Sequence, residues 1–115
     1  MYTFSKKLKL SSYKEFEYVF QKPKFSYSKT MIIFGRFNFL KYPRLGISIP
    51  KKYVKYAHER NRIKRLVREY FRLHKNIFPS MDFVVLIKNS FININSKTIT
   101  KKIEIVWHYY LSQDV

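Results

Sequence analysis

The sequence KKYVKYAHERNRIKRLVREYFRLHK, residues 51–75, carries the strongest structural signal in the chain. Its apolar residues recur at intervals of three and four, which is the period of a helix with one buried side. The pattern predicts a long helix over residues 57–75. The positions expected to face a core are Ile63, Leu66, Val67, Tyr70 and Phe71.

The other side of this expected helix is cationic. Residues 51–75 hold ten Lys or Arg and two Glu, a net charge of +8, and five of the chain's seven arginines. We expect Glu69 to pair with Arg65, but two acids cannot neutralise ten bases, and a planar guanidinium suits phosphate oxygens. The cationic arc on this side of the helix therefore predicts a surface that binds a polyanion, in preference to one that only faces solvent. Its members are Asn61, Lys64, Arg65, Arg68, Arg72 and Lys75, flanked by Arg60 and Arg62.

Upstream of this helix, the sequence predicts a helix followed by three strands. Ser12 and Glu15 form a capping-box pattern that opens a helix over residues 13–22. Residues 24–28, 30–40 and 44–49 read as strands, and we expect the last two to pair as a hairpin. In the middle strand, the side expected to be buried carries Met31, Ile33, Phe37 and Phe39.

Downstream, residues 82–88 (DFVVLIK) form an apolar run short enough to be a strand buried on both faces. Residues 89–95 read as a loop, and Ser96 as the cap of a last helix. Its inward positions would be Ile99, Ile103, Val106, Trp107 and Tyr110. The order is therefore αβββαβα, which predicts a single α+β domain over residues 1–115.

Composition narrows the class of partner. The 115 residues carry a net charge of +17, so the expected partner is nucleic acid, with an anionic membrane surface as the second candidate. There is no cysteine and no apolar stretch of about 18 residues. We expect a cytoplasmic protein with no membrane partner, and a flexible basic N-terminus over residues 1–10.

Residues 44–75, RLGISIPKKYVKYAHERNRIKRLVREYFRLHK, resemble the signature region of the bacterial ribonuclease P protein. The segment RNRIKRLVR, residues 60–68, matches the family's RNR motif without a gap. Pro50 departs from the pattern but lies outside this motif. Other matching positions are Arg44-Leu45-Gly46, Lys51-Lys52, Phe16 and Phe20 in a helix of the form F-x-x-V-F, and residues 82–88 as the last strand.

The resemblance implies a fold that the pattern alone would not give. In that family an α/β sandwich holds a four-stranded sheet, similar to the second domain of ribosomal protein S5. The strand–helix–strand crossover through the RNR helix is left-handed, contrary to the usual rule.

The resemblance also implies two RNA partners, the catalytic RNA of ribonuclease P and the 5′ leader of precursor tRNA. The residues implied to contact the catalytic RNA are Lys51, Lys52, Arg60, Asn61, Arg62, Lys64, Arg65 and Arg68. Those implied for a leader-binding cleft are Phe16, Phe20, Phe34 and Arg36, with Lys24 as a weaker candidate. Stacking suits leaders of any sequence. Core packing explains Phe16 and Phe20 equally well, so both interpretations stay open.

No catalytic site is expected in the protein itself. The seven acids and three histidines are scattered along the chain, and the family places hydrolysis in the RNA, with Mg²⁺ held mainly by the RNA component. No obligate protein partner is evident. Three alternatives remain: a ribosomal or other structural RNA-binding protein, a stand-alone nuclease, and a membrane-active basic peptide.

Overall fold

The computed structural model describes residues 6–88 and 95–111. The helices and strands follow the expected order, with a short 3₁₀ turn before α1 and another after α2. The elements are η1 (Lys6–Leu8), α1 (Tyr13–Gln21), β1 (Lys24–Tyr27), β2 (Met31–Phe37), β3 (Arg44–Ser48), α2 (Ala57–His74), η2 (Lys75–Ile77), β4 (Met81–Ile87) and α3 (Ser96–Leu111).

The sheet has the strand order β1-β2-β4-β3, so the expected hairpin of β2 with β3 is wrong. β4 lies between them, antiparallel to β2 and parallel to β3. Six of its seven residues are buried, and a strand that is apolar on both faces is most stable at the centre of a sheet. β2 and β3 therefore take the two sides of β4.

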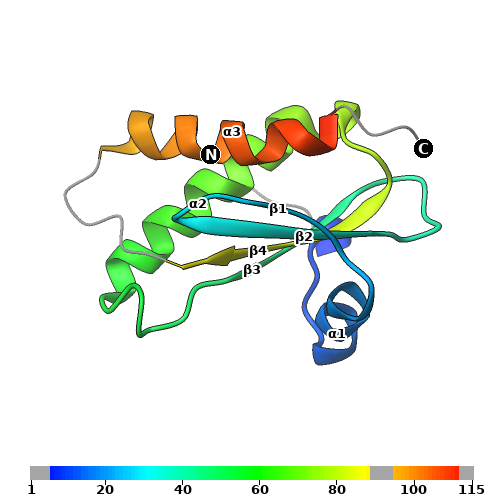
Figure 1. Ribbon diagram of the computed structural model, residues 1–115, viewed down its shortest axis with the longest axis horizontal. Helices are drawn as coiled ribbons and strands as arrows, with labels where there is room; N and C mark the ends of the chain where they lie inside the picture. Colours follow the sequence, from blue (N-terminus) through cyan, green and yellow to red (C-terminus); the bar gives the residue numbers. More distant parts are fainter. Residues whose placement is uncertain (1–5, 89–94, 112–115) are drawn as a thin grey trace.

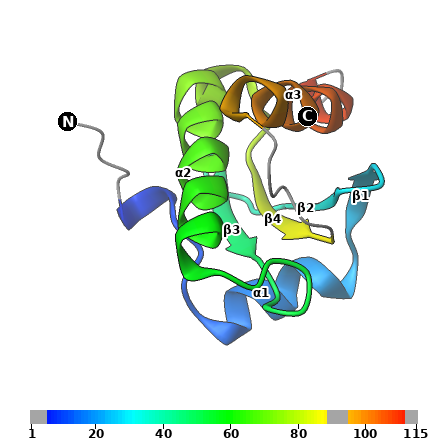
Figure 2. The same ribbon diagram turned by 90° about the vertical axis from the view of Figure 1, so that its left-hand side faces the viewer.

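The β3–α2–β4 crossover has the left hand that the resemblance implies. In Figure 2, β3 and β4 run toward the viewer with α2 above them, and β4 lies to the right of β3. A right-handed connection would place β4 on the other side.

The helices cover both faces of the sheet. α2 and α3 pack together on one face, and α1 lies alone on the other (Figure 1). The main core sits under α2 and α3, and includes Ile63, Val67, Phe71, Phe83 and Trp107. A smaller core of Leu10, Val19 and Val84 lies under α1. The sheet therefore separates the two helical surfaces on which function was expected.

Two of the three α-helices, α1 and α3, start with a side-chain cap, and the cap of α3 differs from expectation. The Ser12 hydroxyl accepts from the Glu15 amide at 3.2 Å and the Glu15 carboxylate accepts from the Ser12 amide at 3.0 Å, which confirms the capping box. In α3 the Thr98 amide donates to Asn95 Oδ1 at 2.8 Å, so Asn95 caps the helix instead of Ser96. All five expected inward residues of α3 are buried.

Two further expectations are wrong within the described residues. Residues 6–10 are packed instead of flexible: Leu8 and Leu10 are buried, and the Leu10 amide donates to the Leu45 carbonyl at 2.9 Å. Phe39 lies beyond the end of β2, in a left-handed conformation (φ 61°), and is 94% exposed. The Asn38 side chain accepts from the Leu40 amide at 2.9 Å and stabilises a turn there.

Candidate RNA interface

The outer side of α2 presents unpaired cations. Ile63, Val67 and Phe71 are fully buried against the core, which turns the opposite arc of the helix outward. Within residues 6–88 and 95–111, no hydrogen bond or ion pair holds the side chains of Lys64, Arg65 or Arg68. We call these three residues, with Asn61, the α2 strip. Their charges are available to an external anion.

The two arginines of the RNR motif make hydrogen bonds within the protein. Arg60 Nη1 donates to the carbonyls of Val54 and Lys55, at 3.0 and 2.8 Å, and so fixes the loop that precedes α2. Arg62 Nη2 donates to Glu59 Oε2 at 3.1 Å. A guanidinium has five N–H donors, so Arg60 keeps others for a phosphate. These two residues shape the surface as well as charge it.

The acid expected to oppose the α2 strip pairs elsewhere. Glu69 accepts two hydrogen bonds from Arg72, one turn further along, and not from Arg65. This contact lowers the pKa of Glu69. The expected Glu69–Arg65 pair is therefore wrong, and Arg65 remains uncompensated. Lys51 and Lys52, also expected at this surface, are exposed in the loop before α2.

A second surface, on the other side of the sheet, is aromatic. The rings of Phe20 and Phe34 pack edge to face, with 5.0 Å between their centroids, and the Phe25 ring centroid lies 6.3 Å from that of Phe34. Phe20 is 44% exposed and Phe25 is 55% exposed. We call these three residues the aromatic cluster. Sequence reasoning missed Phe25, although the antiparallel register of β1 with β2, which sets Phe25 opposite Phe34, would have indicated it.

Phe16, from the same helix as Phe20, has a structural role. Its ring covers Gly46 on β3 so closely that a Cβ added there would lie 2.5 Å from the ring. It also packs against the small core of Val19 and Val84. Phe16 is thus half-buried and packs against the core, whereas Phe20 is 44% exposed, and a leader contact of either ring stays a prediction.

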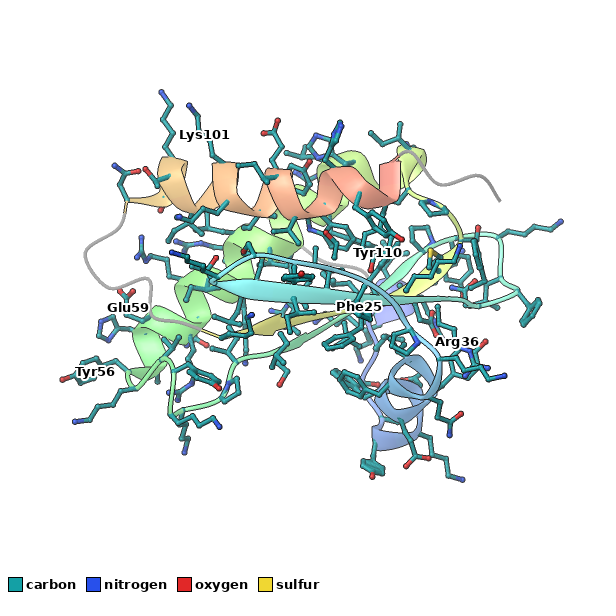
Figure 3. All side chains as sticks on the ribbon, in the orientation of Figure 1. Phe25, Arg36, Tyr56, Glu59, Lys101 and Tyr110 are labelled. Atoms are coloured by element: carbon teal, nitrogen blue, oxygen red, sulfur yellow. The ribbon has the colours of Figure 1, made fainter. Side chains whose placement is uncertain are left out.

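Arg36 joins the aromatic surface to α1. Its guanidinium lies 3.8 Å from the centre of the Tyr18 ring, and Nη1 donates to the Tyr18 carbonyl at 2.8 Å. Figure 3 shows Arg36 beside α1, and Phe25 on the neighbouring strand. The Lys24 ammonium lies over the Phe37 ring at 5.1 Å. Arg36 therefore lies on the α1 side of the sheet with the aromatic cluster, whereas Lys24 lies with Phe37 on the side of the main core.

An ion cluster that sequence reasoning missed fixes α1 to the sheet. Arg44 on β3 donates to Asp82 on β4 and, at 3.0 Å, to Glu15 on α1. Asp82 holds the pKa of Arg44 above its usual value, and the amides of Ser11 and Ser12 lower that of Glu15. Spacing alone gives no signal, since these residues are 29 and 38 positions apart.

Metal and membrane features are absent from the described residues. Within residues 6–88 and 95–111, no three His, Asp or Glu side chains gather where they could hold a metal ion. In the same residues no helix combines the length and apolar character needed to span a bilayer.

Comparison with known proteins places the chain in a family. The ribonuclease P family model matches residues 4–111. The ribonuclease P protein component of Pectobacterium atrosepticum is 46% identical over 113 residues, covering 96% of this chain and 95% of that protein. That of Baumannia cicadellinicola is 48% identical over 107 residues, covering 93% of each.

Solved structures agree with this assignment. A Staphylococcus aureus RNase P protein mutant superposes with a TM-score of 0.84 at 26% identity, covering 90% of this chain and 88% of that one. The Thermotoga maritima RNase P protein superposes with a TM-score of 0.77 at 27% identity, covering 93% of this chain and 98% of that one. The chain therefore belongs to the ribonuclease P protein component family.

Proposed function

We propose that this protein assembles with the catalytic RNA of ribonuclease P through the α2 strip. The observation that carries the proposal is the set of uncompensated cations at Lys64, Arg65 and Arg68. Like charges on one side of a helix repel one another, which destabilises the free protein. RNA phosphates would neutralise these charges and release counterions, and both effects favour binding. Lys51, Lys52 and the RNR residues extend the same contact.

The second part of the proposal concerns the 5′ leader of precursor tRNA. The aromatic cluster offers partly exposed rings to unpaired bases, and Arg36 supplies positive charge on the same face of the sheet. Lys24, on the other face, stays the weaker candidate. Stacking tolerates any base, which suits a substrate class whose leaders differ in sequence. Because the cluster and the α2 strip lie on opposite sides of the sheet, one protein molecule would contact both RNAs at once.

In this proposal the chemistry belongs to the RNA. Mg²⁺ is held mainly by RNA phosphate oxygens, which are ligands that this ion prefers. The protein's own residues reduce electrostatic repulsion, hold the catalytic RNA and bind the leader. The expected location is the cytoplasm, with no membrane and no obligate protein partner.

Reconstituted cleavage tests the proposal. Precursor tRNA is incubated with Mg²⁺ and either the protein, the catalytic RNA, or both. We expect efficient 5′ maturation at moderate salt only from the mixture. Cleavage by protein alone would show a stand-alone nuclease, and RNA binding without any effect on maturation would favour a ribosomal or other structural RNA-binding protein.

A pair of variants with equal charge change locates the effect. Arg65→Ala with Arg68→Ala should lower cleavage at limiting protein concentration. Lys22→Ala with Lys29→Ala removes the same charge from exposed positions next to β1, the sheet edge farthest from β3. Because both lysines flank the strand that carries Phe25, the readout for this control is binding to the catalytic RNA, which should match that of the unmodified protein. Equal losses of this binding in both variants would mean that only net charge matters.

A further inference from the structure

A second cationic feature lies at the far end of α2 from the RNR motif. Four segments form a hollow there: η1, the turn before β3, the end of α2 with η2, and the residues just before β4. Its polar lining consists of Lys7, Lys41, Tyr42, Lys75, Asn76 and Ser80.

Three lysines from three separate segments, Lys7, Lys41 and Lys75, line this hollow. Within the described part of the chain no Asp or Glu lines it. The Lys7 ammonium rests 4.4 Å from the centre of the Tyr42 ring. No hydrogen bond or ion pair in that part of the chain engages Lys41 or Lys75. The positive charge of Lys75 interacts favourably with the negative, C-terminal end of the α2 dipole. Lys7 and Lys41 lie on other segments, so this interaction does not explain their positions.

The walls of the hollow suit an oxyanion with several oxygens. Buried Leu8 and Phe78 form its apolar part, which lowers the local dielectric constant and strengthens attraction to a bound charge. Ser80 and Asn76 add neutral hydrogen-bond donors beside the lysines. A phosphate group offers oxygens to ammonium and neutral donors together.

The position of the hollow suggests where such a phosphate comes from. The 18 residues of α2 span about 27 Å, and its outward cations continue from Lys64 to Lys75, which lines the hollow. We infer that the hollow binds a phosphate group, and that in the assembled particle this group belongs to the backbone of the RNA lying along α2. The second half of the inference rests on the proposed function.

Titration of the free protein with pyrophosphate tests the site itself. Amide NMR signals of Tyr42, Asn76 and Ser80 should shift saturably, both in the unmodified protein and in the Lys22→Ala, Lys29→Ala control. They should not do so in a variant carrying Lys7→Ala and Lys41→Ala. Shifts that do not saturate, or that are equal in all three proteins, would overturn the inference.

Binding to the catalytic RNA over a range of salt concentrations distinguishes the sources of phosphate. Loss of Lys7 and Lys41 should reduce the slope of log affinity against log salt by about one, with the control unchanged. Saturable pyrophosphate binding with an unchanged slope would assign the site to a small phosphate compound and overturn its assignment to RNA. If Arg65→Ala with Arg68→Ala also left RNA binding unchanged, the proposed function would fail, while the pyrophosphate titration would still decide the site.

Discussion

Arg44 holds the carboxylate of Asp82 with two parallel hydrogen bonds, Nε to Oδ1 and Nη2 to Oδ2, each 2.8 Å long. The Asp82 side chain is 2% exposed and that of Arg44 is 22% exposed. Asn38 donates to the same carboxylate at 2.9 Å. Because Arg44 also reaches Glu15, one side chain connects β3, β4 and α1.

Arg44→Ala should therefore destabilise the protein strongly. The substitution leaves Asp82 as a buried charge without its cation, at a cost of about 3 kcal/mol in the free energy of unfolding. Urea unfolding measures this loss. Lys14→Ala, a nearby exposed position on α1, serves as the control. A loss below about 1 kcal/mol would mean that water already compensates the carboxylate.

Gly46→Ala should disturb the surface above it. The new methyl group would overlap the Phe16 ring, and overpacking of this kind costs about 1–3 kcal/mol. We expect α1 to shift, which weakens binding of leader-bearing precursor tRNA more than binding of the catalytic RNA. Adding Phe16→Leu should restore part of the stability. No recovery in that double variant would contradict the packing explanation.

Arg65→Ala and Arg68→Ala should each change the salt dependence of RNA assembly. Each lost phosphate contact lowers the slope of log affinity against log salt by about one. Filter binding to the catalytic RNA between low and moderate salt measures it. A slope equal to that of the unmodified protein would remove that residue from the interface.

Phe20→Ala should weaken leader binding specifically. Loss of one stacked base costs about 1–3 kcal/mol, whereas the half-exposed ring contributes less to the core. The measurement compares affinities for precursor tRNA and leaderless tRNA in the holoenzyme. Ile105→Ala, an exposed position on α3 across the sheet, is the control. An equal effect on both tRNAs would argue against a leader contact.

Acid should remove the stability contributed by Glu15. Its folded-state pKa lies below the ordinary value of 4.5, chiefly because the Ser11 and Ser12 amides donate to the carboxylate. This contribution is therefore fully present above the unfolded-state pKa and is lost as the pH falls through the folded-state pKa. Glu15→Gln should be less stable than the unmodified protein at pH 7, with the difference vanishing in acid. A difference that does not depend on pH would contradict this origin.

Local patterns predicted the helices and their faces. The period of three and four placed Ile63, Val67 and Phe71 inward, and the structure confirms that placement because helical geometry depends on near neighbours. The cationic arc followed from the same geometry. The RNR match carried the family assignment, which composition and periodicity could not supply.

Long-range relationships could not be predicted in this way. The alternation in β2 and β3 is compatible with a hairpin, and only the burial of β4 on both faces hinted that it takes the centre. The Arg44–Asp82 pair joins strands 38 residues apart, and no period marks it. Glu69 had two possible arginine partners within one turn, and side-chain geometry selected Arg72.

The central place of β4 has a consequence for synthesis on the ribosome. Among the strands of the described residues, β3 pairs only with β4, which is made later than α2; its one other bridge is at Leu45, with the segment before α1. Until β4 emerges, the nascent chain exposes a basic helix beside ribosomal RNA with no completed sheet to fix it. Insertion of this strand therefore completes the sheet late in translation, and α3, made after it, then packs beside α2 on the finished sheet.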